Sequence, residues 1–229
     1  MNLTTYDFRD ENGDLLYQEV RKPDKGFYLR RPDGNGGWIH NLDGIRRVLY
    51  GLPELLNSTE PIIWVEGPKD VETLRKLGFT ATTCANGANG WQDDFARYFK
   101  GRHLMVLRDN DAQGIKLRDQ VVRGSRGYAS QIVVLDLPGL PEKGDVTDWF
   151  QVGHGLEEFL DLLRQAERDQ KVSASRKTEE SRPTPSQPQA MLPPFPELAW
   201  VGPLKEWRDT LHGYIAHAEK PGPADTPLC

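Results

Sequence analysis

The fold is decided by a stretch that opens with PIIWVEGPKD (residues 61–70) and closes with LMVLRDND (residues 104–111). Each half begins with a short run of aliphatic or β-branched residues that does not alternate with polar ones. Such runs are typical of strands that are buried on both faces of a parallel sheet. Each run is followed at once by carboxylates and then by a helical pattern. The stretch therefore predicts an open α/β sheet with acidic side chains at one edge.

Three carboxylates follow the two predicted strands, namely Glu66, Asp109 and Asp111. Groups just beyond the carboxyl ends of neighbouring parallel strands meet in one crevice, where open α/β sheets bind ligands. Three carboxylates in one crevice repel one another unless a divalent cation lies between them. Hard oxygen ligands suit Mg²⁺ or Mn²⁺. These three residues are therefore the expected metal ligands and catalytic residues.

The rest of the α/β domain follows from the periodicity of apolar residues. Further strands are expected over residues 79–84 and 131–135. Helices are expected over residues 69–77, 93–99 and 112–126. In the last of these, Ile115 and Val122 are predicted to face inward, with Leu117 as a further candidate. The pattern predicts a Rossmann-like α/β fold with about four parallel strands flanked by helices.

Five segments are expected along the chain. Residues 1–47 should form a small β-rich unit, because turn clusters rich in Gly and Asn separate short strand-like runs. Residues 48–60 bridge this unit to the α/β domain at residues 61–168. Residues 169–196 are polar and rich in Pro and Ser, which predicts a disordered linker. Residues 197–229 predict a short helical tail, either the truncated start of a further domain or a segment that docks on a partner.

The charge of the whole chain does not indicate nucleic acid, because 29 Lys and Arg stand against 34 Asp and Glu for a net charge of −5. Residues 97–128 nevertheless carry eight basic residues and only three Asp. The basic residues are Arg97, Lys100, Arg102, Arg108, Lys116, Arg118, Arg123 and Arg126. Cations around an acidic loop suit a polynucleotide site, since they hold phosphates while carboxylates hold metal. Solvated helix faces are the alternative interpretation.

The cysteine content and the hydropathy of the chain bear on zinc binding, secretion and membrane insertion. The two cysteines, Cys84 and Cys229, are spaced unlike zinc ligands, so no zinc site is expected in this chain, and Cys84 is predicted to be a buried side chain. The start of the chain lacks the features of a signal peptide. No apolar run approaches the ~20 residues that span a bilayer. A cytoplasmic location without membrane contact is expected.

Several polar groups near the predicted crevice are candidates for binding. Lys69, Arg108 and Lys116 would contact nucleotide or DNA phosphates, with a solvated side chain as the alternative at Lys69. Asp70 would either support the metal or complement the dipole of the helix in whose first turn it lies. The loop ANGANGW (residues 85–91) would let backbone N–H groups approach a phosphate, or would be a simple tight turn.

The acidic motifs resemble those of a known domain. EGPKD at residues 66–70, followed by DNDAQG at residues 109–114, resembles the Toprim domain, which bacterial-type primases, topoisomerases and some nucleases and recombination proteins share. The match covers roughly residues 60–165. The two motifs at this separation are more specific than either alone. The resemblance implies that Glu66 and the two aspartates of the second motif hold one or two Mg²⁺ ions.

Segments upstream of these motifs resemble phage and mobile-element primases. RRPDGNGGWI at residues 30–39 and RVLYGLPEL at residues 47–55 are similar to the region that precedes Toprim in those proteins. On that resemblance Arg30 and Arg31 would touch template or nucleotide phosphates. Exposed arginines at the end of a strand are the alternative interpretation.

KGDVTDWF at residues 143–150 resembles the segment that follows the last core strand of Toprim. Acidic residues of that segment help to bind further metals in primases, which makes Asp145 a metal candidate. The glycine between Lys143 and Asp145 departs from the family pattern and leaves the register open. Asp145 is also a suitable N-cap for the helix that follows.

Together these resemblances imply a primase-type Toprim protein that makes primers on single-stranded DNA by metal-dependent nucleotidyl transfer in phage or mobile-element replication. Its expected partners are single-stranded DNA, nucleoside triphosphates and a replicative helicase or helicase domain. A Toprim nuclease that uses the same metals is one alternative. A catalytically silent nucleic-acid-binding or assembly fragment of a primase-helicase is another, because the zinc ribbon that normally begins such primases has no counterpart in this sequence.

Overall fold

Short turns between strand-like runs build the first part of the chain into an antiparallel sheet. β1 (Thr4–Arg9), β2 (Leu15–Arg21), β3 (Phe27–Pro32) and β4 (Trp38–Ile39) form this sheet in the order β1-β2-β3-β4. The turn between β1 and β2 contains Gly13 with a φ of 91°, a conformation that favours glycine. The strands expected in this region are confirmed.

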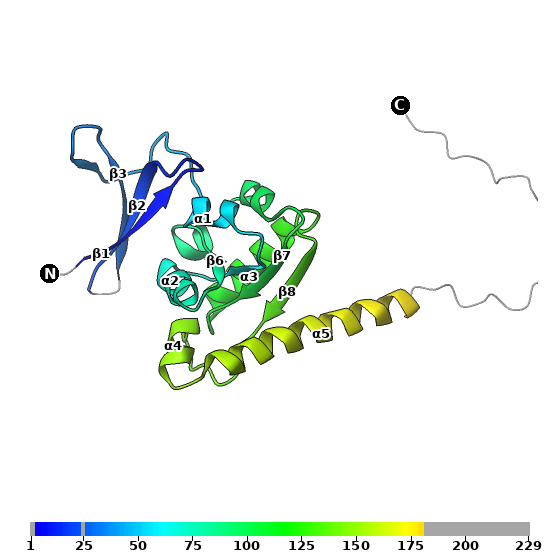
Figure 1. Cartoon of the computed structure of the whole chain (residues 1–229). Coiled ribbons are helices and arrows are strands. Elements are labelled where there is room, and N and C mark those ends of the chain that lie inside the picture. The colour runs from blue at the N-terminus through cyan, green and yellow to red at the C-terminus, as the bar shows by residue number, and fades with distance from the viewer. Residues whose placement is uncertain (1–2, 24–25, 181–229) are drawn as a thin grey trace, which may run out of the picture. The chain divides into compact units, whose positions relative to one another are not determined.

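The computed structural model describes residues 3–23 and 26–180 (Figure 1). The chain divides into two units, Met1–Thr178 and Glu179–Cys229, and both sheets belong to the first. The tail predicted over residues 197–229 lies outside the described residues.

The unalternating apolar runs form a second sheet in which every pair of strands is parallel. β5 (Ile62–Trp64) and β7 (His103–Leu107) lie at its centre, and β6 (Thr80–Thr82) and β8 (Gln131–Leu135) form its edges in the order β6-β5-β7-β8. Both central strands are buried along almost their whole length. The predicted sheet of four parallel strands is confirmed, and β8 has the predicted bounds.

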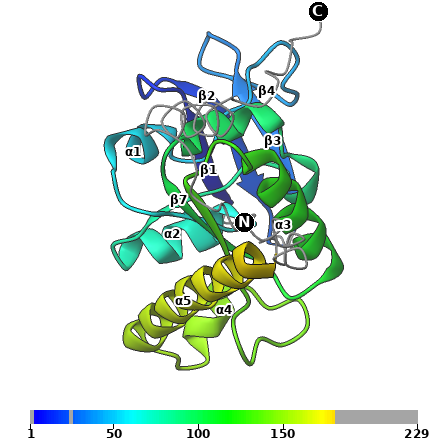
Figure 2. The same cartoon turned by 90° about the vertical axis from the view of Figure 1, so that its right-hand side faces the viewer.

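Helices and 3-10 turns connect the parallel strands. They are α1 (Leu52–Asn57), α2 (Pro68–Lys76), η1 (Gly87–Asn89), η2 (Asp93–Phe99), α3 (Ala112–Ser125), α4 (Val146–Gln151) and α5 (Leu156–Glu180). α4 and α5 lie beside each other in both views (Figures 1 and 2), and Trp149 of α4 contacts Phe159 of α5 with ring centroids 6.0 Å apart. The helices after β5 and β7 were predicted within two residues of their observed ends.

The inward face of α3 differs from the prediction. Its buried stripe repeats every three or four residues and consists of Gly114, Leu117, Val121 and Ser125. Ile115, which was predicted to face inward, is 41% exposed. The reason is the approach of Gly114 to the Asp109 loop, where an added Cβ would lie 2.4 Å from the Asp109 carbonyl oxygen. This contact sets the rotation of the helix and turns Ile115 to the surface.

The predicted linker begins too early in the sequence. α5 continues to Glu180, so residues 169–180 are helical, and the rest of the predicted linker lies outside the described residues. Residues 169–180 contain Gln, Lys, Arg, Glu and Ala, which favour helix even without an apolar face. Their polar composition was therefore compatible with helix as well as with disorder.

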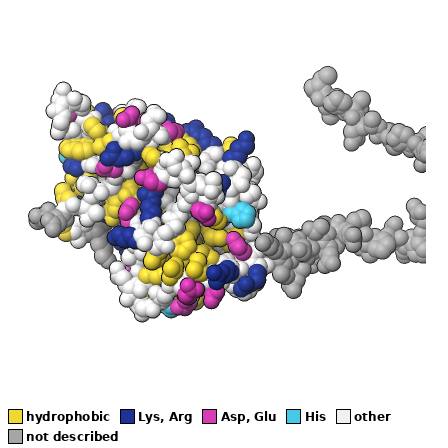
Figure 3. Space-filling view, in the orientation of Figure 1, with side chains coloured by type: hydrophobic (Ala, Val, Ile, Leu, Met, Phe, Trp, Pro, Cys, Tyr) yellow, Lys and Arg dark blue, Asp and Glu magenta, His cyan; other side chains and the backbone are white. Residues whose placement is uncertain are grey.

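One hydrophobic core joins the two sheets through the bridging segment. Val48, Leu49, Tyr50, Leu52 and Leu55 of this segment are buried, whereas Leu56 is 46% exposed. A groove between β8 and α5 leaves Val134 39% exposed, and Figure 3 shows an apolar patch there. Within the described residues, no helix is long and apolar enough to cross a bilayer.

Candidate functional site

The predicted acidic residues lie at one edge of the parallel sheet. β5 and β7 are paired in parallel with Trp64 opposite Val106. Glu66 follows β5 and Asp109 follows β7, each two residues after the strand ends. Because the two strands are direct neighbours, their carboxyl ends meet at the same edge of the sheet. The structure therefore places Glu66 and the Asp109–Asp111 loop as the sequence predicted.

Asp109 lies in a negatively charged environment. Burial, followed by the charges of Glu66, Asp70, Asp145 and Asp111, raises the pKa of Asp109 to about 8. Like charges in a partly desolvated site disfavour the ionised form. Each of the other four predicted carboxylates therefore lies close enough to act on Asp109.

Glu66 has an oxygen that no hydrogen bond satisfies. Among the described residues, Glu66 Oε2 is buried and finds no hydrogen-bond donor. Burial and the charge of Asp111 raise the pKa of Glu66, and Arg21 opposes them. A buried carboxylate oxygen without a donor is costly unless a proton or a cation occupies it.

Asp111 has a structural role as well as a candidate chemical one. It is the N-cap of α3, and its Oδ1 accepts a hydrogen bond of 2.7 Å from the Gly114 N–H. This bond leaves Oδ2 for another partner. The cap also explains why the helix begins directly after the acidic loop.

Asp70 of α2 and Asp145, directly before α4, are the other two carboxylates that act on Asp109. Asp70, only 3% exposed in α2, accepts a hydrogen bond of 2.6 Å from the Thr147 hydroxyl. Burial and the nearby Asp145 raise the pKa of Asp70. Lys69 donates to Asp145 and forms an ion pair with it, so that one positive charge offsets part of this acidic group.

The predicted N-cap at Asp145 is confirmed. Its Oδ1 accepts from the Asp148 N–H at 2.9 Å, and the Asp148 carboxylate accepts from the Asp145 N–H at 3.2 Å, which completes a capping box. Two further bonds join this loop to the acidic loop after β7. The Asn110 N–H donates to the Gly144 carbonyl and the Lys143 N–H donates to the Asn110 carbonyl, both at 3.0 Å.

The donor set fits Mg²⁺ or Mn²⁺ in its chemistry. All of the converging acidic groups are carboxylates, which these cations prefer, and Glu66 Oε2 is the orphaned oxygen among them. Within the described part of the chain, however, no three His, Cys, Asp or Glu side chains lie close enough together to hold a metal ion. Mutual repulsion keeps such carboxylates apart when no cation lies between them.

The predicted basic residues do not form one cluster. The Arg108 guanidinium lies 2.8 Å from the Asp136 carboxylate, and Lys116 is an exposed residue of α3. Arg30 donates to Gln18 at 2.8 Å and lies over the Trp38 ring, 4.0 Å from its centroid. Trp38 itself is 37% exposed.

The two adjacent arginines of β3 lie on opposite faces of their sheet. Arg30 is paired with Gln18, so it shares a face with that residue, and Arg31 shares the face of Glu19. Glu19 accepts a hydrogen bond of 3.2 Å from the Asn86 N–H and thus faces the parallel sheet and its loops. Only Arg31 is therefore on the face turned toward the acidic site.

Three contributors to the site were not predicted from the sequence. Arg21, at the end of β2, lies close enough to Glu66 to lower its pKa against the effect of burial. Thr147 binds Asp70, and Glu19 holds the loop of residues 85–91. These contacts join residues that are far apart in the chain, so short motifs carry no signal for them.

The fold is similar to that of known DNA primase domains. The primase fragment of the bacteriophage T7 primase-helicase matches with a TM-score of 0.51 and 24% identity, over 70% of this chain and 61% of that one. A DNA primase domain from Pseudomonas aeruginosa matches with a TM-score of 0.54 and 22% identity, over 71% of this chain and 50% of that one. The DnaG primase catalytic domain bound to single-stranded DNA matches with a TM-score of 0.52 and 20% identity, over 72% and 53%.

These similarities define the class of fold. The chain has the mixed α/β fold of a primase catalytic core, with a four-stranded parallel sheet and flanking helices. It spans only 61% of the T7 primase fragment and about half of the other two structures. No protein-family model and no curated protein matches the sequence.

Proposed function

We propose that this chain is a primase-type Toprim protein that transfers nucleotidyl groups on single-stranded DNA and so makes primers. The observation that carries the proposal is the edge of the parallel sheet, where Glu66, Asp109 and Asp111 follow the two central strands. The pKa values of Asp109 and Glu66 are raised by burial and by neighbouring carboxylates, as is common for acidic residues in functional sites. The setting in phage or mobile-element replication rests on the sequence resemblance alone.

Glu66, Asp109 and Asp111 would hold the metal, with Asp70 and Asp145 as further carboxylates. When bound, Mg²⁺ or Mn²⁺ would neutralise the charge that develops on the phosphoryl oxygens during an in-line displacement. The capping bond to Gly114 would hold the Asp111 carboxylate in place, and the Thr147 hydroxyl would do the same for Asp70.

Nucleotidyl transfer needs a group that accepts a proton. A hydroxyl oxygen attacks the α-phosphorus, a new P–O bond forms, and the bond to pyrophosphate breaks as the hydroxyl proton leaves. Glu66 is the candidate acceptor, because its buried Oε2 has no donor within the described residues and burial raises its pKa. The alternative within this proposal is that Glu66 only binds the metal and does not accept the proton.

Nucleic acid and nucleotides are the proposed partners. Lys69, Arg108, Lys116 and Arg31 would contact phosphates, whereas Arg30 lies on the far face of its sheet and would contact a different part of the strand. The DnaG primase catalytic domain is known bound to single-stranded DNA. A replicative helicase or helicase domain is the proposed protein partner, since one similar structure is a fragment of a primase-helicase.

Incorporation of labelled nucleoside triphosphates on a single-stranded template tests this proposal. Reactions would contain Mg²⁺, Mn²⁺ or EDTA, and one gel would be examined for both new products and cutting of the template. Short products that require the template and a divalent cation would support the primase function. Metal-dependent cutting without synthesis would indicate the nuclease instead.

A silent binding or assembly fragment is the second candidate. It is favoured by the ion pair between Lys69 and Asp145, which ties up one candidate ligand, and by the separation of the acidic groups within the described residues. Binding of single-stranded DNA and of metal without synthesis or cutting would establish this candidate in place of the enzyme.

A further inference from the structure

A small cavity lies where the antiparallel sheet meets the loop that follows β6. It has a volume of about 110 Å³ and is enclosed by Tyr17 of β2, Arg47 of the bridging segment and the loop of residues 85–92. A single water needs only roughly 10–15 Å³ of such space. The cavity therefore has room for a small polar group together with solvent.

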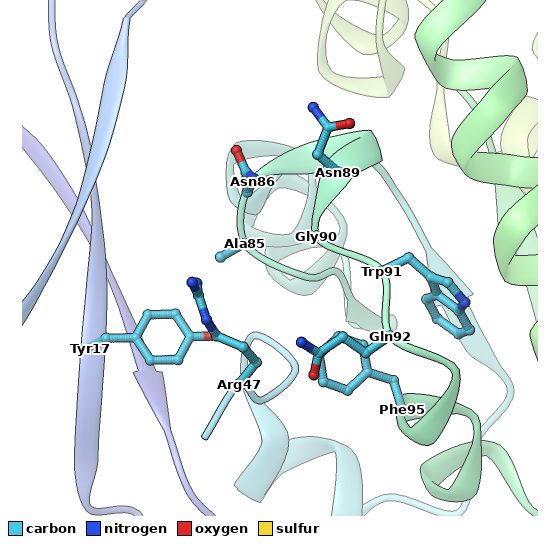
Figure 4. A pocket seen from close by; sticks show the side chains of 9 residues that line it. All are labelled: Tyr17, Arg47, Ala85, Asn86, Asn89, Gly90, Trp91, Gln92 and Phe95. Carbon is cyan, nitrogen blue, oxygen red and sulfur yellow. The ribbon is translucent and has the colours of Figure 1, made fainter. Parts of the chain in front are cut away.

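The lining of this cavity is cationic. Figure 4 shows the Arg47 guanidinium and the Gln92 amide directed into the space beside the Tyr17 ring, while the side chains of Asn86 and Asn89 point away from it. No carboxylate lines the cavity. Among the described residues, Arg47 contacts the Tyr17 ring, 5.6 Å from its centroid, and has no ion pair.

Tyr17 does not compete for a ligand in the cavity. Its hydroxyl donates to the Val48 carbonyl at 3.0 Å and accepts from the Val48 N–H at 3.2 Å. The Tyr17 hydroxyl therefore already has a hydrogen-bond acceptor and a donor within the protein. Arg47 and Gln92 remain as the side-chain donors that face the open space.

The backbone of the loop is held close to the cavity. Asn86 has a φ of 70°, and its N–H donates to the buried carboxylate of Glu19, which lies on the same face of β2 as Tyr17 but is not a lining residue of the cavity. Gly90 packs so tightly that a Cβ would lie 1.7 Å from the Ala85 carbonyl oxygen. The tight fold of the loop itself therefore requires glycine at this position.

We infer that this cavity binds one phosphate group, with the Arg47 guanidinium and the Gln92 amide as donors. An anion is favoured because the lining carries one positive charge and no negative charge, and guanidinium matches phosphate oxygens in geometry. The acidic edge of the sheet repels phosphate unless a cation is bound, whereas this cavity needs none. The assignment deepens the proposed function, on which the choice of phosphate as the anion rests.

Two ligands can supply such a phosphate, a single-stranded DNA chain or a free nucleotide. Binding would be measured in EDTA, so that no metal ion at the proposed carboxylate site contributes to phosphate binding. One arm would use fluorescence anisotropy of a labelled oligothymidylate over a series of salt concentrations, and the other would use calorimetric titration with ATP. Wild type would be compared with Arg47→Gln and with Lys76→Gln, which removes a charge from the exposed end of α2.

If the phosphate belongs to the DNA chain, Arg47→Gln should weaken oligothymidylate binding about tenfold. It should also lower the slope of log affinity against log salt by about 0.7, the value for one lost contact to a single strand. Lys76→Gln should leave both unchanged. A loss of ATP affinity with DNA binding intact would also support the phosphate site and identify the nucleotide as its source.

Equal behaviour of Arg47→Gln and Lys76→Gln toward both ligands would overturn the assignment, as would wild type that binds neither ligand in EDTA. Arg47→Lys keeps the charge and should keep the salt slope, which separates a phosphate contact from a packing role. If Arg47→Gln fails to fold, Gln92→Glu brings a negative charge into the cavity and should weaken binding instead. If Arg47→Gln lowers the salt slope as predicted but the wild type makes no primers, the proposed function is refuted and the phosphate site is still supported.

Discussion

Asp109 titrates differently in the folded and the unfolded chain. Its pKa rises from an ordinary 3.8 to about 8 because it is partly buried among Glu66, Asp70, Asp145 and Asp111. Between these two values the folded chain holds a proton that the unfolded chain has lost. The free energy of unfolding therefore decreases as the pH rises through this window, and the pKa shifts of Glu66 and Asp70 act in the same direction.

Together with the proposed metal site, this titration predicts that Mg²⁺ stabilises the protein more in alkaline than in acidic solution. At about pH 8.5 the cation meets ionised carboxylates, whereas at about pH 6 it must displace the proton of Asp109. Thermal melts with Mg²⁺ or EDTA at the two pH values would measure the difference. Asp109→Asn should reduce it, and an equal rise in Tm at both pH values in wild type would contradict this electrostatic description.

At the scale of single elements, α3 is positioned by a glycine. Gly114 lies in its first turn, and a Cβ there would approach the Asp109 carbonyl oxygen to 2.4 Å and the Asp109 nitrogen to 3.0 Å. The contact is with backbone, which cannot rotate away as a flexible side chain can. The acidic loop and the helix that it caps are thus packed together directly.

Gly114→Ala should therefore destabilise the protein, although glycine to alanine within a helix ordinarily stabilises by about 0.5–1 kcal/mol. The sign is reversed because the loop that carries Asp109 has to move. Chemical denaturation would measure the free energy of unfolding. Gly155→Ala, directly before α5, controls for an added Cβ without steric contact, since a Cβ at Gly155 meets nothing within 4 Å. A stabilised Gly114→Ala variant would show that the loop has room.

Element types were largely predictable, because they depend on local sequence. The runs at residues 62–64, 103–107 and 131–135 consist mainly of β-branched or aliphatic residues and form strands of the parallel sheet. The rotation of α3 was not predictable from periodicity, because it depends on how Gly114 packs against the backbone of the loop that directly precedes the helix. The extent of α5 was missed because a polar sequence without apolar periodicity is compatible with both helix and coil.

At the scale of the whole molecule, the antiparallel sheet is joined to the parallel domain by buried and exposed contacts. The Tyr17 hydroxyl bonds both the carbonyl and the N–H of Val48, and both residues are fully buried. On the surface, the Tyr98 hydroxyl of η2 donates to the Glu11 carboxylate at 2.8 Å, and Glu11 also forms an ion pair with Arg46, where the Arg46 and Glu11 side chains are 45% and 38% exposed. Burial decides which of these contacts matters more for stability.

Tyr17→Phe should cost about 1–3 kcal/mol of unfolding free energy, since it leaves two polar groups of Val48 buried without a partner. Glu11→Gln should cost at most about 1 kcal/mol, because solvent screens an exposed pair. Urea denaturation of both variants would compare them directly. A larger loss for Glu11→Gln would mean that the surface pair, rather than the tyrosine, holds the two sheets together.

The site was predictable where it follows strand ends and was not where it depends on tertiary contacts. Glu66 and Asp109 lie at the edge of the sheet because parallel strands that are neighbours end together. The face of Arg31, the support of Asp70 by Thr147 and the cavity at Arg47 all depend on how the antiparallel sheet and the loops pack. No local pattern in the sequence encodes that packing.

The most direct test of the proposed metal-dependent transfer site is primer synthesis by an Asp109→Asn, Asp111→Asn double variant. Asparagine is also a good N-cap, so the start of α3 should be preserved while both charges are lost. Asp119→Asn, at an exposed position of α3, is the matched control. With Mg²⁺, wild type and the control should make template-dependent products and the double variant none. Undiminished synthesis by a folded double variant would contradict the assignment of the site.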